Sequence, residues 1–247
     1  MTSQRRFKLI ACEILFRELS YCISQSQNII DVVFMPQGLH DIGECKMSTR
    51  LQNEIDKVDA SRYEAILLGY GLCNNGIRGL HSSLPIVVPR GHDCITLLLG
   101  SKARYAEYFQ ENPGTFFKST GWIERDGDPA GNQESVISQL GMNSTYQEYA
   151  AKYGEENARY LMDTLGDWLK NYKKFAYIDT HIGDFQRYKD QTREEAQERG
   201  LDYEEIQGSV ELLLRLLNGE WDSGSFLVVP PNRTLTSTFD DEIIGLA

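Results

Sequence analysis

The sequence that decides the fold is YEAILLGYGLCNNGIRGLHSSLPIVVPRGHDC, residues 63–94. It holds two apolar runs, YEAILLGY and LPIVVP, and each run leads into a turn that carries reactive side chains. Short apolar runs bounded by turn residues are typical of buried parallel strands. In open parallel sheets, binding residues lie beyond the carboxyl ends of the strands. We therefore expect Cys73, after the first run, to lie close to His92 and Cys94, after the second.

Two earlier strand-like segments end in the same way. Residues 7–11 are apolar except for Lys8 and run directly into Cys12, and residues 29–35 lead through a short turn to His40. If the sheet is parallel, five cysteine and histidine residues lie near the carboxyl ends of strands: Cys12, His40, Cys73, His92 and Cys94. This repetition is the strongest functional signal in the chain.

Apolar periodicity extends this pattern along the whole sequence. Strands are expected at 7–12, 29–35, 63–70, 84–89, 115–119, 175–179, 201–207 and 226–229, and helices at 16–25, 47–58, 95–111, 185–198 and 210–217. Alternation of strands with helices predicts an α/β fold with mostly parallel sheets, flanking helices and right-handed crossovers. We expect two Rossmann-like halves with a helical insertion between them. The tail after residue 235 is expected to be peripheral.

Three segments follow from this pattern. Residues 1–125 form an N-terminal α/β half that carries the cysteine and histidine residues. Residues 126–174 begin with a run of turn formers and continue as an amphipathic helix at 145–174, which together make the insertion. Residues 175–247 form the C-terminal α/β half. The sequence leaves open whether the halves share one cleft or one long sheet.

The composition of the 247 residues is that of an ordinary globular protein, with 25% charged residues and a formal net charge of −11. This acidic excess argues against nucleic-acid partners and anionic membrane surfaces. No apolar run reaches the roughly eighteen residues of a spanning helix. Charged residues interrupt the N-terminal segment, so we predict no signal peptide and a cytoplasmic protein. Its five cysteines are then expected to be thiols or metal ligands.

Sulfur and nitrogen donors together suit zinc or iron. We predict that Cys12, Cys73, His92 and Cys94 bind such an ion, with His40 as the alternate ligand. The spacing matches no zinc-finger pattern, and each cysteine is also compatible with a buried core position. A histidine next to an aspartate is equally typical of a hydrogen-bonded turn.

Four further residues are candidates for contact with a small-molecule ligand. Gly71 and Asn74 belong to the glycine-rich turn around Cys73, which could cradle an anion but has neither dinucleotide-binding nor P-loop order. Arg90 could hold a carboxylate or phosphate. His181 follows a strand of the second half and would face a cleft between the halves. A tight turn and surface positions are the alternatives for these residues.

Several of these features resemble a family of bacterial and archaeal proteins known as a domain of unknown function, whose genes often lie beside those of corrinoid-dependent methyltransferases. The shared features are Cys12, Leu39-His40, the glycine-rich turn at Cys73, the His92-x-Cys94 pair, and the segments 114–117 and 228–231. The chain departs from the family pattern at Asn74, where glycine is expected, and at Asp93, where cysteine is expected. The resemblance implies a metal- or thiol-bearing protein of one-carbon metabolism.

We therefore consider three hypotheses. The first is a metal-binding protein, with enzymatic action on a small molecule in methyl-group metabolism left open. The second is a non-catalytic module that docks on a methyltransferase or corrinoid protein through aromatic residues of the 145–174 helix; corrinoid would then be present only through the partner. The third is a thiol redox protein that uses Cys73 and Cys94, although no C-x-x-C motif supports it.

Overall fold

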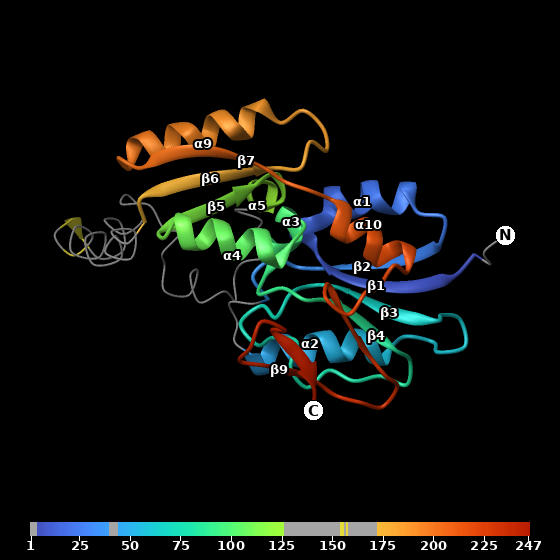
Figure 1. Ribbon diagram of the computed structural model, residues 1–247. Helices are drawn as coiled ribbons and strands as arrows, with labels where there is room; N and C mark the ends of the chain where they lie inside the picture. Colours follow the sequence, from blue (N-terminus) through green and yellow to red (C-terminus); the bar gives the residue numbers. More distant parts are fainter. Residues whose placement is uncertain (1–3, 40–43, 126–153, 156, 158–171) are drawn as a thin grey trace.

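The computed structural model describes residues 4–39, 44–125, 154–155, 157 and 172–247. Strands gather into two mainly parallel sheets that are flanked by helices (Figure 1), so the predicted α/β class is confirmed. The expected insertion at 126–174 and His40 lie almost entirely outside the described residues. Within the described part, no helix is both long and apolar enough to cross a membrane.

The larger sheet has five strands in the order β2-β1-β3-β4-β8. Their bounds are β1 Arg6–Cys12, β2 Ile29–Met35, β3 Ala65–Gly69, β4 Ile86–Pro89 and β8 Phe226–Val229. Strands β1 to β4 are parallel to their neighbours, whereas β8 is antiparallel to β4. β1 lies between β2 and β3, with its Leu9 opposite Val32 of β2 and Leu67 of β3.

Helices cover both faces of this sheet. The helices α1 (Phe16–Gln25) and α10 (Glu211–Asn218) lie on one face, and α2 (Glu44–Asp56) lies on the other (Figure 1). Leu9 packs toward the α1 face and Ile10 toward the α2 face, as the alternation of a two-sided strand requires. The chain changes faces between β2 and β3, so the topological switch point lies between β1 and β3.

The second sheet contains β5 (Thr115–Ser119), β6 (Lys174–Asp179) and β7 (Asp202–Gln207), which are parallel and in that order. The helix α9 (Gln186–Glu198) covers one side (Figure 1). On the other side, Tyr108 of α4 (Lys102–Glu111) meets Phe117 of β5 with ring centroids 5.6 Å apart. After β5 the chain continues into the short helix α5 (Thr120–Arg125).

Side chains from both sheets share one hydrophobic core. Leu19 of α1 and Leu213 of α10 lie in the same buried cluster as Ala176 and Ile178 of β6. The guanidinium of Arg17 donates two hydrogen bonds to the carboxylate of Glu124 in α5, with nitrogen–oxygen distances of 2.6 and 2.7 Å. The two sheets and their helices are therefore joined by one core and by this ion pair.

The structure differs from the expectations in three places. The expected helix at 95–111 is two helices, α3 (Cys94–Leu99) and α4, because Gly100 takes a left-handed φ of 79° and Ser101 starts a new helix. Strand β8 joins the first sheet, although the sequence places it in the second half. The tail is not peripheral: the hairpin of β9 (Leu235–Ser237) and β10 (Ile244–Leu246) buries Ile244 in the α2-side core.

Candidate functional site

Three thiols line one small cavity at the carboxyl ends of neighbouring strands. Cys12 is the last residue of β1, Cys73 lies in the turn after β3, and Cys94 is the first residue of α3, after β4. The other lining residues are Ile14, Leu39, Gly69 and Tyr70. The cavity measures about 20 Å³, which is enough for one water-sized particle. It lies at the switch point, where doubly wound sheets bind their ligands.

Close approach of β1 and β3 brings the first two thiols together. A Cβ added at Gly69 would lie 2.5 Å from the Cβ of Ala11, a distance that real side chains do not tolerate. Glycine at this position therefore allows the ends of the two strands to approach each other.

Backbone hydrogen bonds join the turn after β3 to the turn after β4. The amide of Cys73 donates to the carbonyl of His92 at 2.7 Å, and the amide of Leu72 donates to that of Gly91 at 2.8 Å. A Cβ at Gly71 would meet the amide nitrogen of Asp93 at 2.7 Å. The predicted ligand-binding residue Gly71 thus has a structural role: it lets the two cysteine-bearing turns touch.

The turn after β3 is left-handed over three successive residues. The φ angles of Cys73, Asn74 and Asn75 are 47°, 56° and 65°. Asparagine tolerates this conformation better than other non-glycine residues. Asn74 is therefore compatible with this turn, and its side chain is exposed.

Desolvation favours the neutral form of the three thiols, of which Cys12 is buried and Cys73 and Cys94 are half-buried. Desolvation raises the pKa of Cys12 to about 12, with a smaller upward effect from Glu13. Desolvation also raises the pKa of Cys73 and of Cys94, and the neighbouring cysteines and Asp93 add to both shifts. A hydrogen bond from Trp122 acts in the opposite direction on Cys94.

Tyr70 adds a polar group to the same cavity. Its side chain is buried, and its hydroxyl has no hydrogen-bond partner among the residues that the structure describes. Burial raises the pKa of Tyr70 well above its ordinary value, and Cys12 and Cys73 raise it further. A buried hydroxyl without a partner costs free energy, so a polar or charged occupant of the cavity would relieve this cost.

The chemistry of these donors fits a thiophilic metal ion. Three thiols converge on a space for a single particle, and thiolates are the preferred ligands of zinc and of iron–sulfur centres. Nevertheless, no three Cys, His, Asp or Glu side chains of the described residues form a ready ligand set.

The remaining predicted residues lie elsewhere. His92 is exposed and lines a separate cavity of about 840 Å³. Arg90 is buried, and its guanidinium donates to the carbonyls of Ser223, Glu242 and Ile244 at 2.8, 3.0 and 2.5 Å, so it holds the tail against β4. His40 follows Leu39 of the cavity wall but is outside the described residues.

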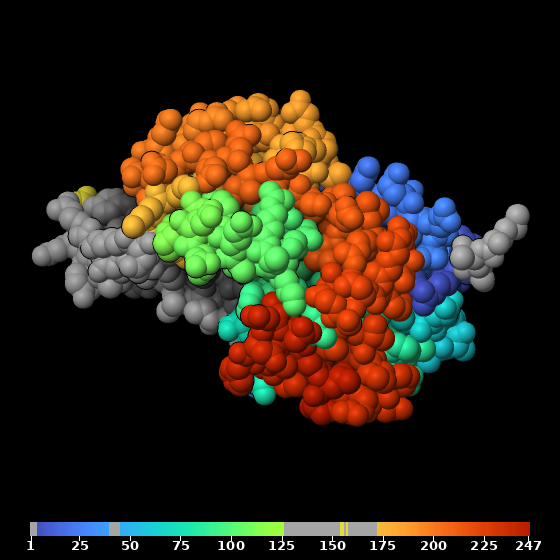
Figure 2. Space-filling model, viewed as in Figure 1, coloured from blue at the N-terminus to red at the C-terminus, as the bar shows by residue number. Residues whose placement is uncertain are grey.

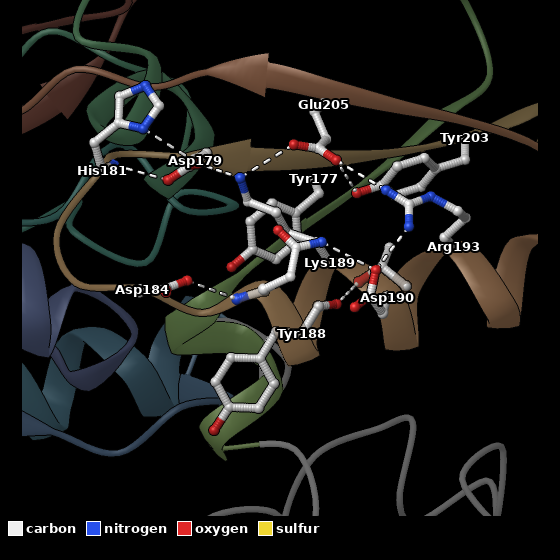
Figure 3. Close-up of polar contacts among 12 residues, drawn as sticks. Tyr177, Asp179, His181, Asp184, Tyr188, Lys189, Asp190, Arg193, Tyr203 and Glu205 are labelled. Atoms are coloured by element: carbon white, nitrogen blue, oxygen red, sulfur yellow. Dashed lines mark hydrogen bonds and ion pairs between the residues drawn. The ribbon is translucent and has the colours of Figure 1, made fainter.

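His181 belongs to an ion-pair network formed by residues of β6, β7 and α9 (Figure 3). Its ring lies 3.2 Å from the carboxylate of Asp179, and its amide donates to the same group. The ammonium of Lys189 lies 2.5 Å from the carboxylate of Asp179 and 3.1 Å from that of Glu205. Burial acts against ionisation of Asp179, but Lys189 outweighs it, and the pKa of Asp179 is lowered. The charges of this network compensate one another, which is typical of structural ion pairs.

Fold and site together define a doubly wound, Rossmann-like α/β protein with a thiol-lined cavity at its switch point. Residues 34–217, well over half of the chain, match the family described as "Protein of unknown function (DUF1638)", and the chain belongs to this family. The match includes Cys73, His92 and Cys94, whereas Cys12 precedes it. Comparison with curated proteins and with solved structures gives no match.

Sequence reasoning missed several residues of this region. Tyr70 was counted only as part of an apolar strand, and Trp122 lies in the short helix α5, which the pattern does not predict. A tyrosine at the end of a buried strand is a usable signal, because a buried tyrosine hydroxyl normally finds a partner. Nothing in the local sequence around Trp122 points to Cys94.

Proposed function

We propose that this protein binds one zinc or iron ion through Cys12, Cys73 and Cys94. The observation that carries the proposal is the convergence of three thiols, from three adjacent parallel strands, on a cavity for a single particle. His92 is proposed as the fourth ligand, since it belongs to the turn whose carbonyl accepts from the amide of Cys73. His40 is the alternate ligand, because it follows Leu39, which lines the cavity.

A metal site agrees better with this geometry than a thiol redox site. Thiol exchange requires an accessible thiolate that a second thiol can approach. Here the cavity has room for about one water molecule, and desolvation opposes ionisation of all three thiols. A bound cation would supply the charge that stabilises the thiolates.

When bound, the ion would act as a Lewis acid on a small molecule or activate a thiol or water. The chain itself would contribute the hydrophobic surroundings of the site, the Tyr70 hydroxyl and the indole N–H of Trp122, which opposes the rise in the pKa of Cys94. Action on methyl groups, together with a methyltransferase or corrinoid protein as partner, is proposed from the family resemblance.

The test is elemental analysis of protein purified without oxygen, supported by cobalt substitution. Wild-type protein is expected to hold about one zinc or iron ion per chain, and cobalt is expected to give sulfur-to-metal charge-transfer absorption. Single Cys12→Ser, Cys73→Ser and Cys94→Ser variants should lose most of the metal. The matched control is Cys45→Ser, because Cys45 is an exposed free thiol outside the cavity.

Two results would refute the ligand assignment. One is full retention of metal by the Cys73→Ser variant when its circular dichroism is that of the wild type. The other is equal loss of metal in the Cys45→Ser control, which would place the ion on the surface. Histidine variants then separate the fourth ligand: only one of His40→Ala and His92→Ala should weaken cobalt binding strongly.

A further inference from the structure

A second, much larger cavity lies between α4 and the C-terminal tail. Its volume is about 840 Å³, within the range of small-molecule sites. The described lining residues are His92, Lys102, Ala103, Tyr105, Ala106, Phe109, Gln110, Asp240, Asp241 and Ile243. Figure 2 shows the two walls side by side on one face of the molecule, α4 in green and the tail in red. None of these described residues is a cysteine, so this cavity is separate from the thiol-lined one.

The α4 wall is aromatic and apolar. Tyr105 is central to it: its ring centroid lies 6.0 Å from that of Phe109 and 6.3 Å from that of His92. Phe109 is 53% exposed, a large fraction for a phenylalanine. Such ring faces bind flat apolar groups and also attract cations through their quadrupoles.

The tail wall is acidic. Asp240 and Asp241 face one basic residue, Lys102, whose ammonium donates to the carbonyl of Asp241 at 2.8 Å and lies 3.9 Å from the carboxylate of Glu242. Asp240 caps the amide of Glu242. In the described structure, no hydrogen bond or ion pair engages the carboxylate of Asp241. The cavity therefore joins an aromatic wall to a carboxylate that has no cationic partner.

We propose that this cavity binds a small organic cation with a flat apolar body. The apolar body lies against Tyr105 and Phe109, and the ammonium group lies beside Asp241. The proposal goes beyond the proposed function and concerns a different cavity. It does not depend on the metal, because no described cysteine lines the cavity.

The larger cavity lies next to the two cysteine-bearing turns. The hydroxyl of Tyr105 lies 3.4 Å from the carboxylate of Asp93, which caps the helix that Cys94 begins. His92 lines the cavity with its side chain and bonds the amide of Cys73 with its carbonyl. A ligand on the aromatic wall would therefore contact His92 and Tyr105, which are bonded to residues of the two cysteine-bearing turns.

The test compares three probes that share one ring: benzylamine, benzyl alcohol and benzoate. Calorimetric titration of the full chain at pH 7 is expected to show benzylamine binding at least about tenfold more tightly than benzyl alcohol, since the cation adds attraction to Asp241 and to the rings. Benzoate should bind most weakly. Equal affinity for all three, or a preference for benzoate, would overturn the proposal.

Variants locate the binding. Phe109→Ala and Asp241→Asn are exposed substitutions that leave the core intact, and each should weaken benzylamine binding about tenfold or more. The control is Phe239→Ala, because Phe239 is fully exposed in the same tail but does not line the cavity. Unchanged binding in both lining variants, or a loss in the control, refutes the site. Metal content is measured in the same samples, so failure of either proposal is seen separately.

Discussion

At the scale of single residues, small side chains decide whether the cysteine-bearing turns can meet. Gly71 lies against Asp93 and Gly91, and an added Cβ would come within 2.7 and 2.8 Å of their backbone atoms. This contact is between backbones, so it cannot relax by rotation of a side chain. The contact between the two turns thus depends on glycine at this position.

The Gly71→Ala substitution tests this dependence. It is expected to lower the free energy of unfolding by about 1–3 kcal/mol, as overpacking does, and to reduce metal content. Gly79→Ala is the comparison, because the space around Gly79 is open and only its φ of 82° is unfavourable for alanine. This variant is expected to lose about 1 kcal/mol of unfolding free energy and to retain its metal. Denaturant unfolding and elemental analysis measure both effects. Normal metal content in Gly71→Ala protein would contradict the account.

Glu18 is a buried carboxylic acid, and the free-energy cost of ionising it should make the stability of the fold depend on pH. Burial raises its pKa above the ordinary 4.5, although Thr180 donates to one of its oxygens at 2.8 Å. The other oxygen has no partner among the described residues. Since the folded-state pKa lies above the unfolded one, the stabilising contribution is complete below about pH 4.5 and is lost as pH rises through the raised pKa.

Glu18→Gln removes this ionisation. The variant is therefore expected to be more stable than wild type at pH 7, and the difference should shrink toward pH 4, because a buried amide costs less than a buried charge. Urea unfolding at both pH values provides the measurement. The exposed Glu107→Gln substitution should show no such pH-dependent gain. If the gain in stability of Glu18→Gln over wild type is smaller at pH 7 than at pH 4, this explanation is contradicted.

At the scale of elements, two helix caps make it possible to distinguish an effect on stability from an effect on the geometry of the metal site. Asp93 caps α3 by accepting the amides of Ile95 and Thr96 at 3.0 and 3.4 Å. Ser101 caps α4 by accepting the amide of Arg104 at 3.4 Å. Only the first cap holds a helix that begins with a thiol of the cavity.

Substitution of each cap by alanine should therefore give different results. Asp93→Ala and Ser101→Ala are each expected to cost about 1 kcal/mol of stability, the usual effect of losing a cap. Metal affinity should fall only in Asp93→Ala, because Cys94 loses its fixed position. Cobalt titration of both variants compares them directly. Equal cobalt affinity in the two proteins would mean that the cap does not position the thiol.

The positions of most elements could be predicted from apolar periodicity alone. The expected helix at 16–25 and strands at 29–35 and 115–119 coincide with α1, β2 and β5. The error at 95–111 has a local cause: the apolar pattern continues across Gly100, and only the left-handed turn at that residue separates α3 from α4. A glycine within a helical pattern is tolerated often enough that it does not predict a break.

At the scale of the whole molecule, the C-terminal tail closes the structure. Buried Arg90 holds three carbonyls from residues 223, 242 and 244, and the tail forms one wall of the larger cavity. A single side chain directly after β4 therefore links the first sheet to the proposed ligand site. The expected contact of Arg90 with an anionic ligand is replaced here by contacts with the chain itself.

Arg90→Ala is expected to release the tail. Hydrogen bonds to charged groups contribute about 1.5–3 kcal/mol each, so we expect a loss of at least about 2 kcal/mol, together with faster proteolysis near the C-terminus and weaker benzylamine binding. Arg233→Ala is the control, since Arg233 is exposed and donates to the carbonyl of Ala247 at 2.9 Å. Wild-type resistance to protease in Arg90→Ala would show that other contacts hold the tail.

The sequence by itself determined where the buried strands lie and that Cys12, Cys73 and Cys94 follow three of them. Both are local properties, since burial follows the apolar pattern and a residue's place at a strand end follows from its position in the chain. Only the tertiary structure decided that β8 pairs with β4, that the tail returns to Arg90, and that the side chain of His92 lines the larger cavity. These outcomes depend on contacts between residues that are far apart in the chain. A local sequence pattern does not contain the free energies of such contacts.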